Sequence, residues 1–345
     1  MLIYIVRRTL LAALTLAVIS FATFFIVQLP EGDIVDQYDT LLMGVATDKK
    51  TINKVELREK WGLNDPLIVQ WVNWVVPIFT RGDFGTSYTE AVAATEQGYE
   101  VREVINQYLP YTIYLSVFTA VITWVLSIPI GIYSAVRQNS VGDYIFTFFG
   151  FAGLAVPDFL LGLVAMYIAF AYFDHSVGGI FSGEYLTAPW SVARLIDMLQ
   201  HLIIPGIVLG TAGTAGLIRV MRNNLLDELR KPYVVTATAK GLAGWRVVLK
   251  YPVRVALNPF ISGIGGMLPS LVSGSVIISI VLSLPTLGPI FVESVMYQDG
   301  PLVSAAVLMF SALSVIGTLI SDLLLVVVDP RIKLTGSARG GSSEV

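Results

Sequence analysis

The residues best suited to chemistry are acidic side chains that stand inside long uncharged stretches. Asp158 directly follows Pro157 in one such stretch, and Asp322 lies near the end of another. A carboxylate in apolar surroundings is costly, so it is a candidate for lining the path of a polar solute. The Asp158 carboxylate can equally cap the helix that restarts after Pro157, or bond a neighbouring helix. Asp322 lies close to Asp329-Pro330-Arg331, which favours structural pairing instead.

Glycine and serine gather in the apolar stretch 256–283. They occur there as Ser262-Gly263, Gly265-Gly266 and Ser273-Gly274-Ser275. Small residues let transmembrane helices approach closely, and they also permit a hinge. A second hypothesis is that serines of this stretch line a pathway, the candidates being Ser270, Ser273 and Ser279.

Enzyme chemistry is not supported by the rest of the sequence. The two histidines, His175 and His201, lie outside or at the edge of apolar stretches, and no His-Glu-x-x-His pattern occurs. The sequence also lacks a glycine-rich phosphate-binding loop with Lys, and it has no Cys. We therefore expect no catalytic residue, no metal and no cofactor in this chain. Any ATP and Mg must be bound by partner subunits.

The elements that carry these residues are apolar helices. The 345 residues are 55% hydrophobic and 14% charged, with a mean hydropathy of +0.73; soluble domains are roughly 25% charged. A helix needs roughly 20 apolar residues to cross a bilayer. We predict an all-α polytopic membrane protein with six transmembrane helices, of which the third and fifth are long enough to be tilted, or broken at Pro157 and at Pro259 or Pro269. The six stretches are 9–29, 111–136, 144–173, 202–220, 256–283 and 303–328.

Basic residues set the expected orientation. Placing the N-terminus inside puts 14 of the 22 Lys and Arg on the cytoplasmic side, as the positive-inside rule requires of short loops. Residues 1–29 then form a cytoplasmic N-terminus and a retained first span, because the apolar run is too long for a signal peptide. Both termini are expected in the cytoplasm, with residues 110–329 as the membrane domain and 330–345 as a tail. Nothing in the charge pattern suggests nucleic acid.

The long segment 30–109 is expected outside the membrane. It mixes acidic and basic residues and contains Trp61, Trp71 and Trp74. Turn signals occur at Asn64-Asp65-Pro66 and at 81–85, which reads Arg-Gly-Asp-Phe-Gly. We predict a small extracytoplasmic subdomain of short helices. The alternative is an irregular loop whose Trp residues float in the membrane interface.

The cytoplasmic loop 219–254 contains a predicted docking helix. Pro232 suits the first turn of a helix, and Gly241 suits the residue after its end. The intervening segment of about nine residues would be on the order of 13 Å long. Its middle has small side chains that would let a partner's groove approach the backbone, and Lys240 complements the helix dipole. The small residues are Thr236, Ala237, Thr238 and Ala239.

This loop resembles the EAA loop of ABC importer permeases, in the Thr-Ala-x-Ala-Lys-Gly form of the dipeptide and oligopeptide family. The resemblance extends along most of the chain. It includes the Arg-Arg start, residues 57–70, Arg-Gly-Asp-Phe-Gly-Thr-Ser at 81–87, and Leu-Pro-Tyr-Thr at 109–112. It also includes Ala-Val-Pro-Asp-Phe-Leu-Leu-Gly at 155–162 and the ending 322–333.

Two departures from the family pattern occur in the loop. Pro232 precedes Tyr233 where the family usually has an acidic residue, and Thr238 stands where a basic residue is usual. The Glu of the broader pattern is also absent, with Val235 or Thr236 near its place. The resemblance implies that the helix docks on an ATPase, with a changed charge pattern. The implied ATPase-coupling residues are Tyr233, Thr236, Ala237, Ala239, Lys240 and Gly241.

The resemblance implies a type I ABC importer permease fold in a cell inner membrane. The expected partners are a second homologous permease, two cytoplasmic ABC ATPases, an extracytoplasmic solute-binding protein and membrane lipid. Peptides are the first expectation for the solute, with oligosaccharides or another small solute as alternatives. A secondary transporter is the remote rival, but it would need midplane charges and inverted repeats.

Overall fold

The computed structural model describes residues 2–29, 35, 55, 58–59, 62–87, 99–173 and 178–328. Trp61, His175, Asp329-Pro330-Arg331 and the tail 330–345 lie outside the described residues. Much of the segment 30–109 lies outside them too, so the predicted external subdomain is described only in part.

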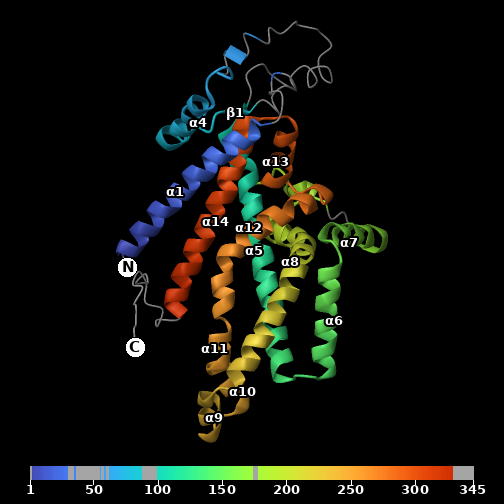
Figure 1. Cartoon of the computed structure of the whole chain (residues 1–345). Coiled ribbons are helices and arrows are strands. Elements are labelled where there is room, and N and C mark those ends of the chain that lie inside the picture. The colour runs from blue at the N-terminus through green and yellow to red at the C-terminus, as the bar shows by residue number, and fades with distance from the viewer. Residues whose placement is uncertain are drawn as a thin grey trace, which may run out of the picture.

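Within the described residues, long helices form a bundle and short elements gather at both of its ends (Figure 1). The N-terminal part contains α1 (Leu2–Val27), α4 (Leu67–Arg81), β1 (Thr86–Ser87) and β2 (Tyr99–Glu100). The bundle continues with α5 (Val101–Val136), α6 (Val141–Ala155), α7 (Asp158–Phe173), a 3-10 turn at Gly183–Tyr185 and α8 (Val192–Leu229). The remaining helices are α9 (Pro232–Ala239), α10 (Gly244–Lys250), α11 (Pro252–Ala256), α12 (Asn258–Val281), α13 (Leu287–Met296) and α14 (Gly300–Val328).

Among the residues that the structure describes, four helices, α1, α5, α8 and α14, are long and apolar enough to cross a membrane, and two bent pairs can supply two more spans. This agrees with the six predicted stretches. The pair α6–α7 bends by 103° at Pro157, which has no N–H to continue the helix. The break predicted there is therefore present. In α12 the bend is 55° and lies between Met267 and Ser270. Pro259 lies in the first turn, where a proline does not interrupt the helix.

The helices extend well beyond the apolar stretches that predicted them. α8 has 38 residues and α5 has 36, so each is roughly 55 Å long against a hydrocarbon core of about 30 Å. Polar residues fix two of the starts. Ser191 Oγ accepts the Arg194 N–H at the start of α8, and Ser140 Oγ accepts the Asp143 N–H at the start of α6. The extra turns place loops and short helices outside the membrane.

The centre of the bundle is the contact between α5 and α8. Glycines allow this approach: a Cβ added to Gly131 would lie 2.5 Å from the Met221 Cβ. At Gly210 it would lie 2.8 Å from the Thr123 hydroxyl. Close packing of small residues is the usual source of helix association in lipid, where the hydrophobic effect between helices is weak.

A two-stranded antiparallel ladder departs from the purely helical expectation. Thr86 pairs with Glu100 and Ser87 with Tyr99. Beside it, an apolar cluster joins α1, α4 and the adjoining ends of α5 and α14. The cluster includes Phe24, Trp74, Val101, Ile105, Leu302 and Ala305. The N-terminal segment is thus packed onto the bundle.

Candidate functional site

The candidate docking helix is present as predicted. α9 begins with Pro232 at its first position and ends at Ala239, one residue shorter than expected. The Gly241 N–H donates to the Thr238 carbonyl at 2.9 Å, and Gly241 has a φ of +77°. Glycine adopts this left-handed conformation without strain. The helices α9 and α10 lie at the far end of α8, opposite α4 and β1 (Figure 1).

One face of α9 packs on its own loop. Val234 and Ala237 are buried and contact Val247 of α10, with Tyr251 beside them. Ala237 is one of the six predicted coupling residues, and within this chain its side chain is buried against α10. Positions 234 and 237 are three apart and therefore share one helix face. Ala237 therefore helps to hold α9 against α10.

The other side of α9 is exposed. Its outward residues are Tyr233, Val235, Thr236, Ala239 and Lys240, and the Val235 side chain is 64% exposed although it is apolar. Five of the six predicted coupling residues therefore lie on or beside an accessible surface, because Gly241 is also exposed. No other part of the chain covers this surface within the described residues.

A tyrosine ties α9 to the end of α8. The Tyr233 hydroxyl donates a short hydrogen bond to the Glu228 carboxylate. Partial burial, together with this hydrogen bond and the negative charge of Glu228, raises the pKa of Tyr233 to about 12. The phenol is therefore neutral and able to donate throughout the physiological pH range. Because the folded pKa is above the ordinary value of 10.0, this contribution to stability is complete below pH 10 and is lost as the pH rises towards 12.

The loop is anchored at its base by an apolar cluster. Met221 and Leu225 of α8 are fully buried against Val253 and Ala256 of α11 and Phe260 of α12. α9 therefore lies between two helices that are fixed to each other. A displacement of α9 must be passed to both α8 and α12.

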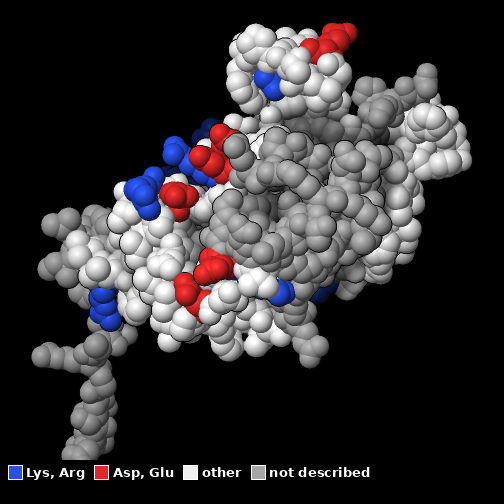
Figure 2. All heavy atoms as spheres, turned by 90° about the horizontal axis from the view of Figure 1, so that it is seen from above, with Lys and Arg blue, Asp and Glu red and all other residues white. Residues whose placement is uncertain are grey.

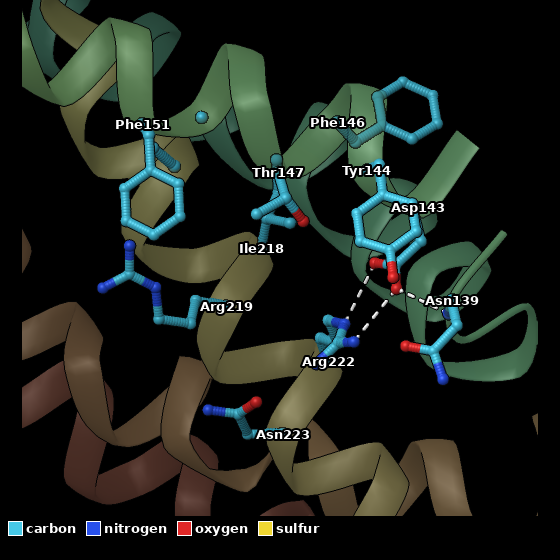
Figure 3. Close-up of a pocket in the computed structure, with 12 residues that line it drawn as sticks. Asn139, Asp143, Tyr144, Phe146, Thr147, Phe151, Ile218, Arg219, Arg222 and Asn223 are labelled. Atoms are coloured by element: carbon cyan, nitrogen blue, oxygen red, sulfur yellow. Dashed lines mark hydrogen bonds and ion pairs between the residues drawn. The ribbon is translucent and has the colours of Figure 1, made fainter. Parts of the chain in front are cut away.

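An ion pair that the sequence analysis missed supports the same end of α8. Arg222 donates from Nε to Asp143 Oδ1 and from Nη2 to Asp143 Oδ2, each at 3.0 Å (Figure 3). The Asn139 N–H also donates to Asp143 Oδ2 at 3.0 Å. This two-point contact fixes the start of α6 to α8. The pattern Ser140-x-x-Asp143 marks the start of a helix, but it does not reveal the distant partner.

The ion pair borders a hollow of about 320 Å³ between α6 and α8. Aromatic side chains line one wall, and the Arg219 guanidinium lies 4.7 Å from the centre of the Phe151 ring (Figure 3). Such stacking stabilises a cation that has left bulk water. The polar groups at its rim include Asn139 and Asn223.

The predicted polar residues of the spans remain apart in the structure. Asp158 is the first residue of α7 and is half-buried, and no described hydrogen bond joins its carboxylate to a backbone N–H as a cap would. Ser270 and Ser273 are exposed and donate to carbonyls of their own helix, those of Met267 and Ser270. No described contact joins Asp158 to either serine.

Asp322 forms an ion pair with a residue far away in the sequence. Its Oδ2 lies 2.7 Å from Arg8 Nη2, which joins α14 to the start of α1. The contact supports a structural role for Asp322, whereas the expected pairing with Asp329-Pro330-Arg331 falls on residues outside those that the structure describes. Among the described residues, no group of three or more His, Cys, Asp or Glu side chains could hold a metal ion.

A second contact missed from the sequence lies at the opposite end of the bundle. The Ser87 hydroxyl donates to Asp299 Oδ2 at 2.6 Å, and both residues are fully buried. Asp299 Oδ1 accepts the Leu302 N–H and so caps α14. The Trp74 indole donates to the Phe84 carbonyl at 3.0 Å. The 81–87 motif thus attaches the N-terminal segment to α14.

Two family models match the chain. The model described as "Binding-protein-dependent transport system inner membrane component" matches residues 127–334. The model described as the N-terminal part of such a membrane component matches residues 1–116. The first match contains α9, the Asp143–Arg222 pair and most of the bundle, and the second contains α1, α4 and β1–β2.

Several similar proteins are peptide permeases by name. The chain is 37% identical over 331 residues to the oligopeptide transport system permease protein AppB of Bacillus subtilis (strain 168), covering 96% of this chain and 99% of that protein. It is 32% identical over 333 residues to the dipeptide transport system permease protein DppB of Lactococcus lactis subsp. cremoris (strain MG1363), with coverage of 96% and 99%. It is 30% identical over 333 residues to the glutathione transport system permease protein GsiC of Salmonella typhimurium, again with coverage of 96% and 99%.

Proposed function

The chain belongs to the family of binding-protein-dependent transport system inner membrane components, and from this membership we propose that it forms half of the pathway of an ATP-driven peptide importer. It is a multi-pass membrane protein. Relatives named as oligopeptide, dipeptide and glutathione permeases support peptides as the solute. Oligosaccharides are the alternative solute. Identifying the ligand of the solute-binding protein would distinguish peptides from oligosaccharides.

The observation that carries this proposal is the exposed surface of α9. A short helix with a buried face on α10 and an uncovered face containing Val235 suits insertion into a cleft of another protein. The cluster at its base links it to α8 and α12. Closure of two ATPases would then change the tilt of both helices and switch the pathway between its two openings.

The proposed assembly contains a second homologous permease, two ABC ATPases that bind ATP and Mg, and a solute-binding protein. In this assembly α9 and both termini face the cytoplasm, and α4 and β1–β2 face outward. The basic residues of the α9 end support this orientation. This chain would contribute no catalytic residue. Asp158, Ser270 and Ser273 are proposed as pathway or structural polar residues, because they are not fully covered within the chain.

The proposal is tested by purifying the tagged chain from membranes in mild detergent. We expect a second permease and an ATPase to co-purify, with ATP hydrolysis rising when the binding protein and a short peptide are added. An oligosaccharide that stimulates hydrolysis where peptides do not would replace the proposed solute. If the chain purifies without partner subunits and supports transport into liposomes without ATP, the importer proposal is contradicted.

Gly241 provides a sharper test of α9. Gly241→Val places a β-branched residue at a φ of +77°, whereas Gly241→Asn is tolerated there. An added Cβ meets no atom of this chain within 4 Å, so backbone strain is the difference between the variants. We expect uptake to be abolished in the Val variant and largely kept in the Asn variant, with equal membrane insertion. Equal uptake by the Val and Asn variants would contradict the role of α9 as the coupling element.

A further inference from the structure

The helix α4 has three distinct faces. Trp71, Trp74, Val75 and Ile78 pack on the bundle, and Gln70, Asn73, Thr80 and Arg81 lie on the polar side. Between them runs a third face that is both apolar and uncovered. Its side chains are spaced as one helix surface and are 40–77% exposed in the chain: Ile68, Val69, Val72, Val76 and Phe79.

The contacts of α4 set its depth relative to the membrane. Trp71 meets Phe21 of α1 edge-on, with ring centres 5.4 Å apart, and its indole N–H donates to Ser20 at 3.4 Å. Phe21 lies six residues before Val27, the last residue of α1, which is roughly 9 Å along the helix. The packed face of α4 therefore reaches into the last two turns of a membrane-spanning helix.

The polar side of α4 faces the C-terminal end of α1, whereas the packed face contacts residues further inside α1. Gln28, just after α1 ends, donates from its amide to Gln70 Oε1 at 3.0 Å. Gln70 in turn donates to the carbonyls of Leu63 and Asp65. The polar side therefore meets the polar end of α1, while the tryptophans reach deeper. This places α4 at the boundary between headgroups and acyl chains.

We propose that α4 lies in the membrane surface, with the face formed by Ile68, Val69, Val72, Val76 and Phe79 among the acyl chains. The occupant of this face is lipid of the leaflet at this end of the bundle, the outer leaflet in the orientation proposed above. Its surface continues that of α1, where Phe25 and Ile26 are 44% and 60% exposed on a span that must contact lipid.

Lipid explains this face better than a docking protein does. None of its five side chains can form a hydrogen bond, whereas a surface that binds a water-soluble partner reversibly has polar groups at its rim. An amphipathic helix at a membrane surface normally buries its apolar side roughly 5–10 Å below the headgroups. Figure 2 shows the charged side chains of the described residues on this face in small groups of both signs, and not as one continuous charged patch. Lipid contact at this face would be the same whichever solute the importer carries.

The absence of Cys from the sequence makes single-cysteine variants a clean test. Val72→Cys and Phe79→Cys report on the apolar face, and Asn73→Cys reports on the polar side. Each full-length variant is purified, spin-labelled and placed in nanodiscs of phosphatidylethanolamine and phosphatidylglycerol. Collision with oxygen, which concentrates in acyl chains, is then compared with collision with a water-soluble nickel chelate.

We expect an oxygen-to-nickel collision ratio several-fold higher at positions 72 and 79 than at position 73. Equal ratios at the three positions would overturn the proposal. A loss of oxygen collisions at position 72 on adding the binding protein or the second permease would assign the face to a protein instead. An unlabelled Ile78→Cys variant, which places the thiol on the packed face, should react slowly with a maleimide. Rapid reaction of this thiol would contradict the docking of α4 on α1.

Discussion

At the scale of single residues, charged side chains in this protein are paired across distant parts of the chain. Asp143 is joined to Arg222, 79 residues later, and its side chain is 3% exposed while that of Arg222 is 24% exposed. Removing one partner of such a pair leaves the other charge poorly solvated, which costs more than the pair itself contributes. The pair is therefore a point where one substitution has a large effect.

Asp143→Ala is expected to lower the free energy of unfolding by about 2 kcal/mol, less than for a fully buried pair because Arg222 is partly solvated. Thermal unfolding of the purified protein measures the change. Asp227→Ala, at an exposed position of α8, is the matched control and should change stability by no more than about 0.5 kcal/mol. Equal shifts in both variants would show that the ion pair contributes little.

Local sequence signals predicted some of these residues and missed others. Pro232 and Gly241 bound α9 correctly because a helix start and a helix end depend on the conformation of a few neighbouring residues. Asp143, Ser87 and Asp299 were missed because their partners are 79 and 212 residues away. The burial of Ala237 was not predicted, because it depends on contacts with α10.

At the scale of elements, the fit between α5 and α8 depends on glycines. A Cβ at Gly131 would lie 2.5 Å from the Met221 Cβ and 3.1 Å from the Ile218 carbonyl oxygen. Backbone atoms cannot yield as a flexible side chain can, so the two helices would have to separate. By contrast, a Cβ at Gly216 of α8 meets no atom within 4 Å.

Gly131→Ala should destabilise the bundle by about 1–3 kcal/mol through overpacking. Gly216→Ala should be neutral or slightly stabilising, because alanine favours a helix more than glycine does. Both variants add one methyl group to the same helix pair, so their difference isolates the close approach. Thermal unfolding in the same detergent compares them, and a Gly131→Ala protein as stable as the Gly216→Ala protein would contradict this packing.

The apolar pattern predicted the long helices but not their ends or angles. Six stretches appeared because apolar composition over roughly 20 residues is a strong signal. The polar turns that extend α8 to residues 192–229 have no such signal. The position of the break after α6 followed from Pro157, whereas its 103° angle depends on packing that involves many residues.

At the scale of the whole molecule, a buried hydrogen bond adds to the apolar contacts that join the N-terminal segment to the last helix. Ser87 donates to Asp299, which also caps α14. Arg8 and Asp322 join the same two parts at the other end of α1. The N-terminal segment and α14 are thus held together at both ends of α1.

Asp299→Ala removes both the cap and the acceptor of Ser87, and we expect a loss of about 3 kcal/mol in stability. Trypsin should also cut faster after the exposed Arg81, because the 81–87 segment would be released from α14. Ser262→Ala is a suitable control, since its hydroxyl bonds only the Asn258 carbonyl of its own helix among the described contacts. Cleavage at an unchanged rate in Asp299→Ala would contradict the anchoring role.

The continuity of α8 has a consequence for the size of the movement that the proposed importer can make. One helix of 38 residues, roughly 57 Å long, connects the base of α9 to the far surface. A tilt of about 10° around one end would displace the other end by roughly 10 Å over that length. If α8 pivots near α9, a small rotation there is therefore enough to move its far end by about the diameter of a helix.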